Sequence, residues 1–468
     1  MGSHRVMRRI ALLSAWLVPA AVQAQGFGLN EIGSCAVARG YALTGLPCDD
    51  ASVIYWNPAA ATRLTGLSVY AGVAAIMVNG DFTADTTGAL FEGDVPVEYP
   101  PHLFVNYETK WGFAAGLGVY VPYGLTSQWR EDFPGRFSAL KASLATIYVQ
   151  PNIAFELVPG RVSIGGGPVF GHSDVELIQS LDIADVETQA GGPTFGQLGI
   201  AANTEFARAS LEGGATAWGF HVGVHTRITP EFEFGARYLS ELEFKYDDAD
   251  ASFRQISTGL VFAANNPLGL PAGTEFDDVL AAQFAAGGAL VDQKVSTTIR
   301  HPAQFQAGIG YSGLASTKLS LDYEWIDWSA FDELPVDFQG PAAGNNRLLI
   351  EDYEDSWSVR TGIEYTLGSG GAAGMALRGG FSYVSTPAPD VTVTPLLPDM
   401  NRYNIGLGIG IPFGGRYALD ASYLRVETEG RRGRIAERDD RSQTAADLNS
   451  GFYTLDANVF SVSLKAQF

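Results

Sequence analysis

A chain of 468 residues is long enough for one large architecture or for two to three ordinary domains. Its formal net charge of −21 argues against a nucleic-acid partner, because binding to phosphates needs basic patches. The 55 glycines weaken helix interiors, so the composition does not favour a helical protein.

The first 24 residues have the pattern of a secretory signal peptide. Met7–Arg9 form a positive start, Ile10–Val18 an apolar core, and Val22–Ala24 a small-residue cleavage site. A buried N-terminal helix is the alternative. After Ala24 the chain has no apolar run of about 18 residues, the length that a membrane-spanning helix needs. We therefore expect an exported protein that does not cross a membrane with helices.

Two cysteines, Cys35 and Cys48, lie early in the exported chain. Because the compartment is oxidising, we expect them to form a disulfide. Such a bridge would close a short loop and add about 3 kcal/mol of stability by the loop-entropy model. Two free thiols are the alternative. Further ligands do not cluster around the cysteines, so we expect neither a metal site nor a cofactor.

The remainder of the chain alternates between apolar residues and small or polar ones. In the last run, Phe460, Val462 and Leu464 fall on one face, and Ser461 and Ser463 fall on the other. This period of two is typical of a β-strand. About fourteen such runs occur, near residues 66–79, 100–109, 112–123, 142–157, 161–175, 214–228, 232–246, 299–312, 317–329, 353–368, 374–387, 401–414, 417–428 and 455–468.

The connections between these runs are alternately short and long, which is the pattern of an outer-membrane barrel. We expect an all-β fold, a 14-stranded antiparallel transmembrane β-barrel in the bacterial outer membrane with both termini in the periplasm. The C-terminal Phe468 resembles the signal by which the barrel-insertion machinery recognises such proteins. A soluble array of strands, the alternative, explains the period but not these other features.

Residues 25–65 precede the first strand and have no strand period. An irregular backbone cannot face lipid, because its polar groups would be unpaired. The segment therefore either hangs in the periplasm or folds into the lumen, which in a barrel of this size is wide enough for a solute. Glycines on the inner face leave room for a plug (Gly116, Gly118, Gly308, Gly310, Gly406 and Gly408). We expect a signal peptide (1–24), a hatch that plugs the lumen (25–65) and a barrel (66–468).

The segment "GFGLNEIGSCAVARGYALTGLPCDDASVIYWNPAAATRL" resembles the N-terminal hatch of the FadL-type long-chain fatty acid and hydrocarbon transporters (OmpP1/FadL/TodX). The resemblance continues through most of residues 26–468, including "VYVPYGLTSQWREDFPGRF" and "LDYEWIDWSAFDEL". The cysteine pair is the main departure, and it would make this hatch stiffer than usual. The resemblance implies hatch or gating roles for Phe27, Asn30, Glu31, Asp49, Asp50, Asn57, Pro58 and Ala59.

The same resemblance implies a transport mechanism. A hydrophobic molecule is caught by the outer loops, passes to a lumen site and rearranges the start of the hatch. It then leaves sideways through a gap at a kink in the third strand, which is Gly112–Tyr123 in this sequence. Gly116, Gly118 and Pro122 are the candidates for the kink, because glycine favours bulges and proline lacks an N–H group. Ordinary lumen packing and a strand end are the alternative.

Two long loops, residues 176–213 and 247–298, are more apolar than loops in water usually are. Exposed apolar patches often mark binding sites. We expect substrate capture by Phe195, Leu198, Phe262, Phe276, Leu280 and Phe284. Alternatively, these side chains pack on one another and cap the barrel.

Alternation places Arg227, Arg237, Arg360 and Arg378 on the lumen face. A fatty acid carboxylate that enters a lumen of low dielectric constant needs a partner. The guanidinium group suits this role because its fork can bind a carboxylate through two hydrogen bonds. Alternatively, the arginines pair with wall carboxylates such as Glu233, Asp322, Glu324 and Glu364.

The leading hypothesis is a passive transporter for hydrophobic molecules, with long-chain fatty acids first and aromatic or aliphatic hydrocarbons as the alternative. A general porin and a structural or adhesive barrel are rivals from other classes. We expect that the protein is not an enzyme, because the sequence shows no convincing Ser/His/Asp set or phosphate-binding loop.

Three weaker patterns have ordinary explanations beside functional ones. His221 and His225 share a lumen face without a third metal ligand. Residues 247–250 form either a solvated acidic loop or a calcium site. Residues 431–441 form either a solvated charged loop or a contact with outer-membrane lipopolysaccharide.

Overall fold

The computed structural model describes residues 26–468, except positions 86, 110, 188–191, 267, 341–345, 369–373 and 434–449. The predicted signal peptide therefore lies outside the described residues. So does most of the charge-rich loop at 431–441. Within the described part of the chain, no helix combines the length and apolarity that crossing a membrane requires.

Antiparallel strands form a closed 14-strand barrel, which confirms the predicted fold. Twelve of the wall strands are single elements, and the other two are each made of a consecutive pair, β8 with β9 and β10 with β11. The last strand closes the barrel on the first, from Ser68 opposite Gln467 to Ala84 opposite Gly451. The wall comprises β1 (Gly66–Ala84), β3 (Pro101–Thr109), β4 (Phe113–Gln128), β5 (Lys141–Val158), β6 (Val162–Asp182), β7 (Glu205–Arg227), β8 (Phe232–Leu239), β9 (Leu242–Gln255), β10 (Gln293–His301), β11 (Gln304–Leu314), β12 (Thr317–Ile326), β15 (Ser356–Thr366), β16 (Ala376–Val384), β17 (Arg402–Phe413), β18 (Tyr417–Thr428) and β20 (Gly451–Gln467).

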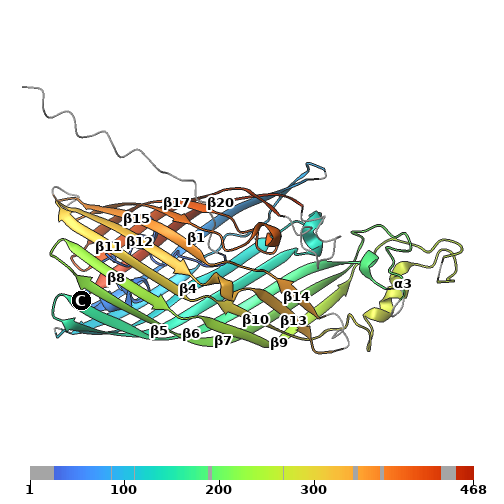
Figure 1. Cartoon of the computed structure of the whole chain (residues 1–468), viewed down its shortest axis with the longest axis horizontal. Coiled ribbons are helices and arrows are strands. Elements are labelled where there is room, and N and C mark those ends of the chain that lie inside the picture. Colours follow the sequence, from blue (N-terminus) through green and yellow to red (C-terminus); the bar gives the residue numbers. More distant parts are fainter. Residues whose placement is uncertain are drawn as a thin grey trace, which may run out of the picture.

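Shorter elements lie outside this wall. The loops carry β2 (Leu90–Glu92), β13 (Glu333–Phe338), β14 (Arg347–Ile350), β19 (Arg431–Gly433), α3 (Phe276–Leu280) and the 3-10 turns η2 (Pro134–Phe137), η3 (Ile183–Asp185), η4 (Ala281–Gln283), η5 (Trp328–Ala330) and η8 (Asp390–Thr392). The loops around α3 project from the end of the barrel opposite the C-terminus (Figure 1).

The strands expose apolar side chains outward and bury small polar ones inside. On β20, Phe460, Val462 and Leu464 are 46–49% exposed, whereas Ser461 and Ser463 are each 1% exposed. An outward apolar band of this kind is what a lipid-facing barrel wall requires.

The wall is irregular beside β4. The ladder between β3 and β4 ends at Leu103 opposite Val119, although β4 continues to Gln128. On the other side of β4, the register with β5 shifts between Tyr120 and Tyr123. Gly116 and Gly118 pair regularly with β3, so the irregularity lies at Val121–Pro122.

Residues 26–65 form a compact, almost fully buried segment inside the barrel. It contains α1 (Ser34–Ala38), α2 (Val53–Trp56) and the 3-10 turn η1 (Pro58–Arg63). We call this segment the hatch.

Candidate functional site

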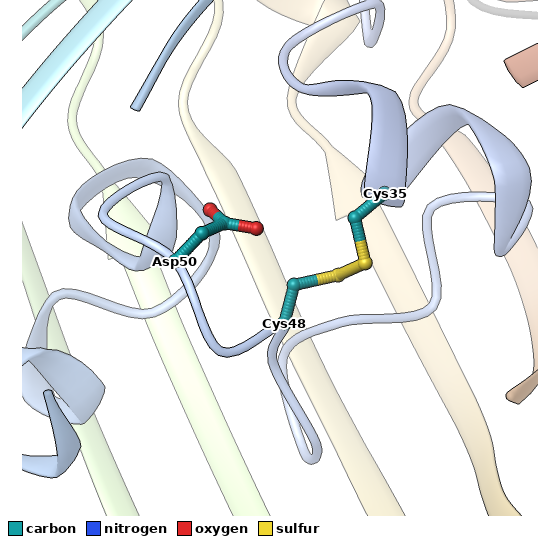
Figure 2. Close-up of side chains that lie close together, drawn as sticks. All are labelled: Cys35, Cys48 and Asp50. Carbon is teal, nitrogen blue, oxygen red and sulfur yellow. A yellow bond between two sulfur atoms is a disulfide. The ribbon is translucent and has the colours of Figure 1, made fainter. Parts of the chain in front are cut away.

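A disulfide between Cys35 and Cys48 confirms the predicted bridge (Figure 2). Both cysteines are at most 5% exposed. Among the described residues, these two and Asp50 form the one group of Cys, His, Asp or Glu close enough to hold a metal ion. Since the two sulfur atoms are bonded to each other, no thiolate is free to act as a ligand.

Asp50 lies beside the disulfide with its carboxylate turned toward it (Figure 2). The backbone N–H and the hydroxyl of Ser52 donate to Oδ1 of Asp50, at 2.9 and 2.5 Å. Burial, with a smaller contribution from Asp420, raises the pKa of Asp50 to about 6 against the lowering effect of the Ser52 hydrogen bonds. Unlike Asp50, the neighbouring Asp49 is exposed and pairs with Lys318 at 2.9 Å.

Asn57 and Pro58 fix the hatch to the wall. The Asn57 amide donates to the carbonyl oxygens of Thr44 in the hatch and Val224 in β7, at 2.9 and 3.0 Å. Its Oδ1 accepts a hydrogen bond from the Ala59 N–H at 3.2 Å, which caps η1, and Pro58 occupies the first turn. Proline is favoured there because its missing N–H would have no partner in any case.

Glycines on the inner wall make room for the hatch, as the sequence predicted. A Cβ on Gly116 would lie 2.7 Å from Cδ1 of Ile54, and one on Gly408 would lie 2.5 Å from Cβ of Ala38. A Cβ on Gly406 would overlap the Val37 carbonyl. Three wall amides also donate to hatch carbonyls, namely Asn106 to Ala61, Gln150 to Ile54 and Asn152 to Pro58.

The substitution Gly235→Ala is expected to loosen the hatch. Its Cβ would overlap the carbonyl oxygen of Thr44 and approach the Asn57 amide to 2.5 Å. Overpacking of this kind costs about 1–3 kcal/mol. Hydrogen exchange should therefore show weaker protection of hatch amides in the variant than in the wild type.

Gly80→Ala is the matched control, because a Cβ at this wall position meets nothing closer than 3.7 Å. If both variants protect the hatch amides equally well, the close fit between hatch and wall is not what holds the segment in place.

The predicted carboxylate-binding arginines already have partners. Arg237 donates to Gln306 at 2.8 Å and lies 3.5 Å from Glu324, which also pairs with Arg360. The guanidinium groups of Arg237 and Arg360 lie over the hatch rings Tyr55 and Tyr41, at 4.8 and 5.8 Å.

The other two predicted arginines are engaged elsewhere. Arg378 pairs with Glu364 and Asp420, at 2.8 and 2.5 Å. Arg227 is exposed and donates to the Gly160 carbonyl at 3.4 Å. None of these four arginines is among the residues that line the cavities described below, and a carboxylate-binding role for them stays a prediction.

The start of the hatch forms an arm, residues 26–31, that lies along the irregular part of β4. The Leu29 N–H donates to the Pro122 carbonyl at 2.8 Å, and the Gly124 N–H donates to the Phe27 carbonyl at 3.0 Å. The Gly26 N–H donates to Oδ2 of Asp399 at 3.0 Å. The arm therefore supplies hydrogen bonds where the β3 ladder has ended.

Phe27 inserts its ring into an aromatic cage. Its ring centroid lies 4.7 Å from that of Trp328, 5.4 Å from Phe331, 5.6 Å from His301 and 5.9 Å from Tyr123. These four rings come from three separate parts of the chain, so sequence spacing could not reveal the cage.

Two largely apolar cavities are each lined in part by the arm. The smaller, about 90 Å³, is lined by Phe27 and by wall and loop residues such as Val295, Ile299 and Phe331. The larger, about 410 Å³, is lined by Gly26, Gly28 and Leu29 of the arm. Leu125, Leu144 and Leu397 line both cavities and thus separate them.

The larger cavity reaches the outside of the wall. Its lining includes Ile147 on the outward side of β5, which is 45% exposed, and Tyr99 in the segment before β3, which is 62% exposed. It also includes Val121 and Gly124, which lie at and beside the irregularity of β4 at Val121–Pro122; we call this irregularity the break in β4. The larger cavity thus connects the lumen side of the arm with the side of the barrel.

The predicted capture residues form a separate cluster in the outer loops. Phe195, Phe262, Phe276 and Leu280 are at most 5% exposed, and the rings of Phe262 and Phe276 stack at 3.8 Å. Phe284 packs against this cluster, and Leu198 is half-buried. The arrangement matches the alternative explanation, in which the loops pack on themselves, and none of these side chains lines either cavity.

The sequence matches the model of a family described as outer membrane protein transport protein (OMPP1/FadL/TodX) over residues 15–468. A long-chain fatty acid transport protein of Escherichia coli O6:H1 is 25% identical over 416 residues, covering 85% of this chain and 86% of the relative. Outer membrane protein P1 of Haemophilus influenzae is 22% identical and covers 98% of both chains.

Solved structures share the fold. A FadL homologue of Pseudomonas aeruginosa superposes with a TM-score of 0.76 at 20% identity, covering 95% of this chain and 100% of its own. The Pseudomonas putida toluene transporter TodX superposes with a TM-score of 0.65 at 14% identity, with coverages of 95% and 100%.

Proposed function

Because the chain belongs to the outer membrane protein transport protein family (OMPP1/FadL/TodX), we propose that it is a passive transporter that admits hydrophobic molecules through the outer membrane. Long-chain fatty acids are the first candidate substrates, and aromatic or aliphatic hydrocarbons are the second. The names of the relatives support both classes. The protein is not an enzyme in this proposal.

The observation that carries the proposal is the pair of apolar cavities. They meet at Leu125, Leu144 and Leu397, and the larger one leads to the side of the barrel at the break in β4. Below them the buried hatch fills the lumen. A hydrophobic molecule that passes these three side chains therefore has a mostly apolar route from the lumen toward the bilayer, whereas the axial route crosses buried polar groups.

The arm acts as the gate in this mechanism. A molecule that enters the smaller cavity competes with Phe27 for the aromatic cage. Displacement of Phe27 breaks the hydrogen bonds between the arm and β4, at Pro122 and Gly124. The larger cavity then opens toward the lipid. Asn57, Pro58 and the disulfide keep the rest of the hatch in place while the arm moves.

Two partners complete the proposal. The insertion machinery recognises the terminal strand that ends at Phe468, and the outer loops contact lipopolysaccharide. Both partners are expected for an outer-membrane barrel of any function.

An uptake assay tests the function. Expression in a Gram-negative host that lacks transporters for hydrophobic compounds should increase uptake of a labelled long-chain fatty acid, toluene or an alkane. The compound whose uptake rises decides between the two substrate classes. If a folded, inserted barrel raises the uptake of none of them, the transport proposal is wrong.

A further inference from the structure

The charged residues around the larger cavity are mostly acidic. Its described lining contains Glu31, Glu98 and Asp399, with Arg402 as the one basic side chain. Arg402 already has two hydrogen-bond partners, because its Nη2 lies 3.3 Å from both Oδ1 of Asp399 and the carbonyl oxygen of Gly26. An anionic head group in this cavity would therefore meet more negative than positive charge.

Glu31 and Glu98 are paired with hydroxyl groups. Tyr41 donates to Oε1 of Glu31 at 2.8 Å, and Thr126 donates to Oε1 of Glu98 at 2.8 Å. A hydroxyl satisfies a carboxylate oxygen without cancelling its charge. These two side chains flank the route from different sides, Glu31 from the arm and Glu98 from the segment before β3.

The ionisable side chains that line the smaller cavity are also acidic. Glu176 and Glu212 are the ionisable residues among its described lining. Lys141 pairs with Glu176 at 2.5 Å but does not line the cavity. The basic residues that could attract an anion, Arg237, Arg360 and Arg378, are held in ion pairs outside both cavities.

We propose that these cavities select the uncharged form of a hydrophobic ligand over a carboxylate, with Glu31 and Glu98 as specificity-determining residues. This proposal rests on the proposed transport function and narrows its substrate class to hydrocarbons, alcohols, esters or protonated fatty acids. Like charges repel more strongly beside the half-buried Glu31 than in water, and the exposed Glu98 adds a weaker repulsion that water and salt screen.

Three probes of equal chain length differ only in their head group, so a comparison of their affinities measures the effect of its charge. Binding of 1-dodecanol, dodecanoate and dodecylamine to the purified full-length protein is measured at pH 8 by equilibrium dialysis. Dodecanoate should bind about tenfold more weakly than dodecanol, which corresponds to the repulsion between two like charges roughly 12 Å apart at an effective dielectric constant near 20. Dodecylamine should bind at least as tightly as dodecanol.

A double variant, Glu31→Gln with Glu98→Gln, should remove most of the difference between dodecanoate and dodecanol. Glu275→Gln is the control, because Glu275 is exposed in an outer loop and lines neither cavity. Equal affinity of the wild type for dodecanoate and dodecanol would overturn the proposal without needing any variant. Failure of all three probes to bind would instead refute the transport function on which it rests.

Discussion

Deletion of residues 26–65 is expected to turn the protein into an open, water-filled pore. A barrel of fourteen strands encloses a lumen wide enough for small solutes. In the complete chain this space is occupied by the buried hatch, which contacts the wall through Asn57, Ser34 and the wall glycines. Its removal leaves polar side chains facing water, and planar-bilayer recordings should show a large steady conductance.

The deletion variant must first be shown to fold, for example by heat-dependent migration on gels, since it loses many buried contacts. The complete chain is the control and should show little steady conductance. A folded, inserted deletion variant with the conductance of the complete chain would mean that the hatch is not the plug.

Filling the boundary between the two cavities should strongly reduce transport without opening the pore. Leu144 lines both cavities and is 6% exposed, so the larger side chain of Leu144→Trp has to occupy cavity space. A mismatch of about 1–3 kcal/mol would weaken binding of a hydrophobic ligand roughly five- to 150-fold. Uptake of the transported compound should fall correspondingly, with the low conductance of the closed pore retained.

Leu117→Trp is the matched control, because Leu117 lies on the lipid-facing side of β4 and is 43% exposed. It should leave uptake near the wild-type level. If Leu144→Trp transports as well as this control, the hydrophobic molecule does not pass between the cavities.

The wall was predictable because its physical signal is local. Alternation depends on residues two positions apart, so it marked every wall strand, including 299–312, which crosses the break between β10 and β11 at Pro302 and Ala303. The hatch followed from the absence of that period and from the glycines opposite it. The disulfide followed from the exported compartment.

The site was less predictable because it depends on contacts between distant segments. Alternation placed Arg237 and Arg360 inside the barrel, but it could not show that both pair with Glu324 and that none of the three lines a cavity. The apolar composition of the loops could not separate a binding surface from a small core. Leu397 reaches the cavities from a loop, and Leu125 lies beyond the predicted end of its strand.

Photo-labelling tests the central claim most directly, namely that a hydrophobic molecule occupies the lumen beside the break in β4. A diazirine-bearing dodecanol is bound to the full-length protein, activated, and mapped by peptide mass spectrometry. Labels are expected near Leu125, Leu144 and Leu397, and excess unlabelled dodecanol should prevent them. Labels confined to lipid-facing residues such as Leu117 and Ile153, with none in the lumen, would contradict this claim.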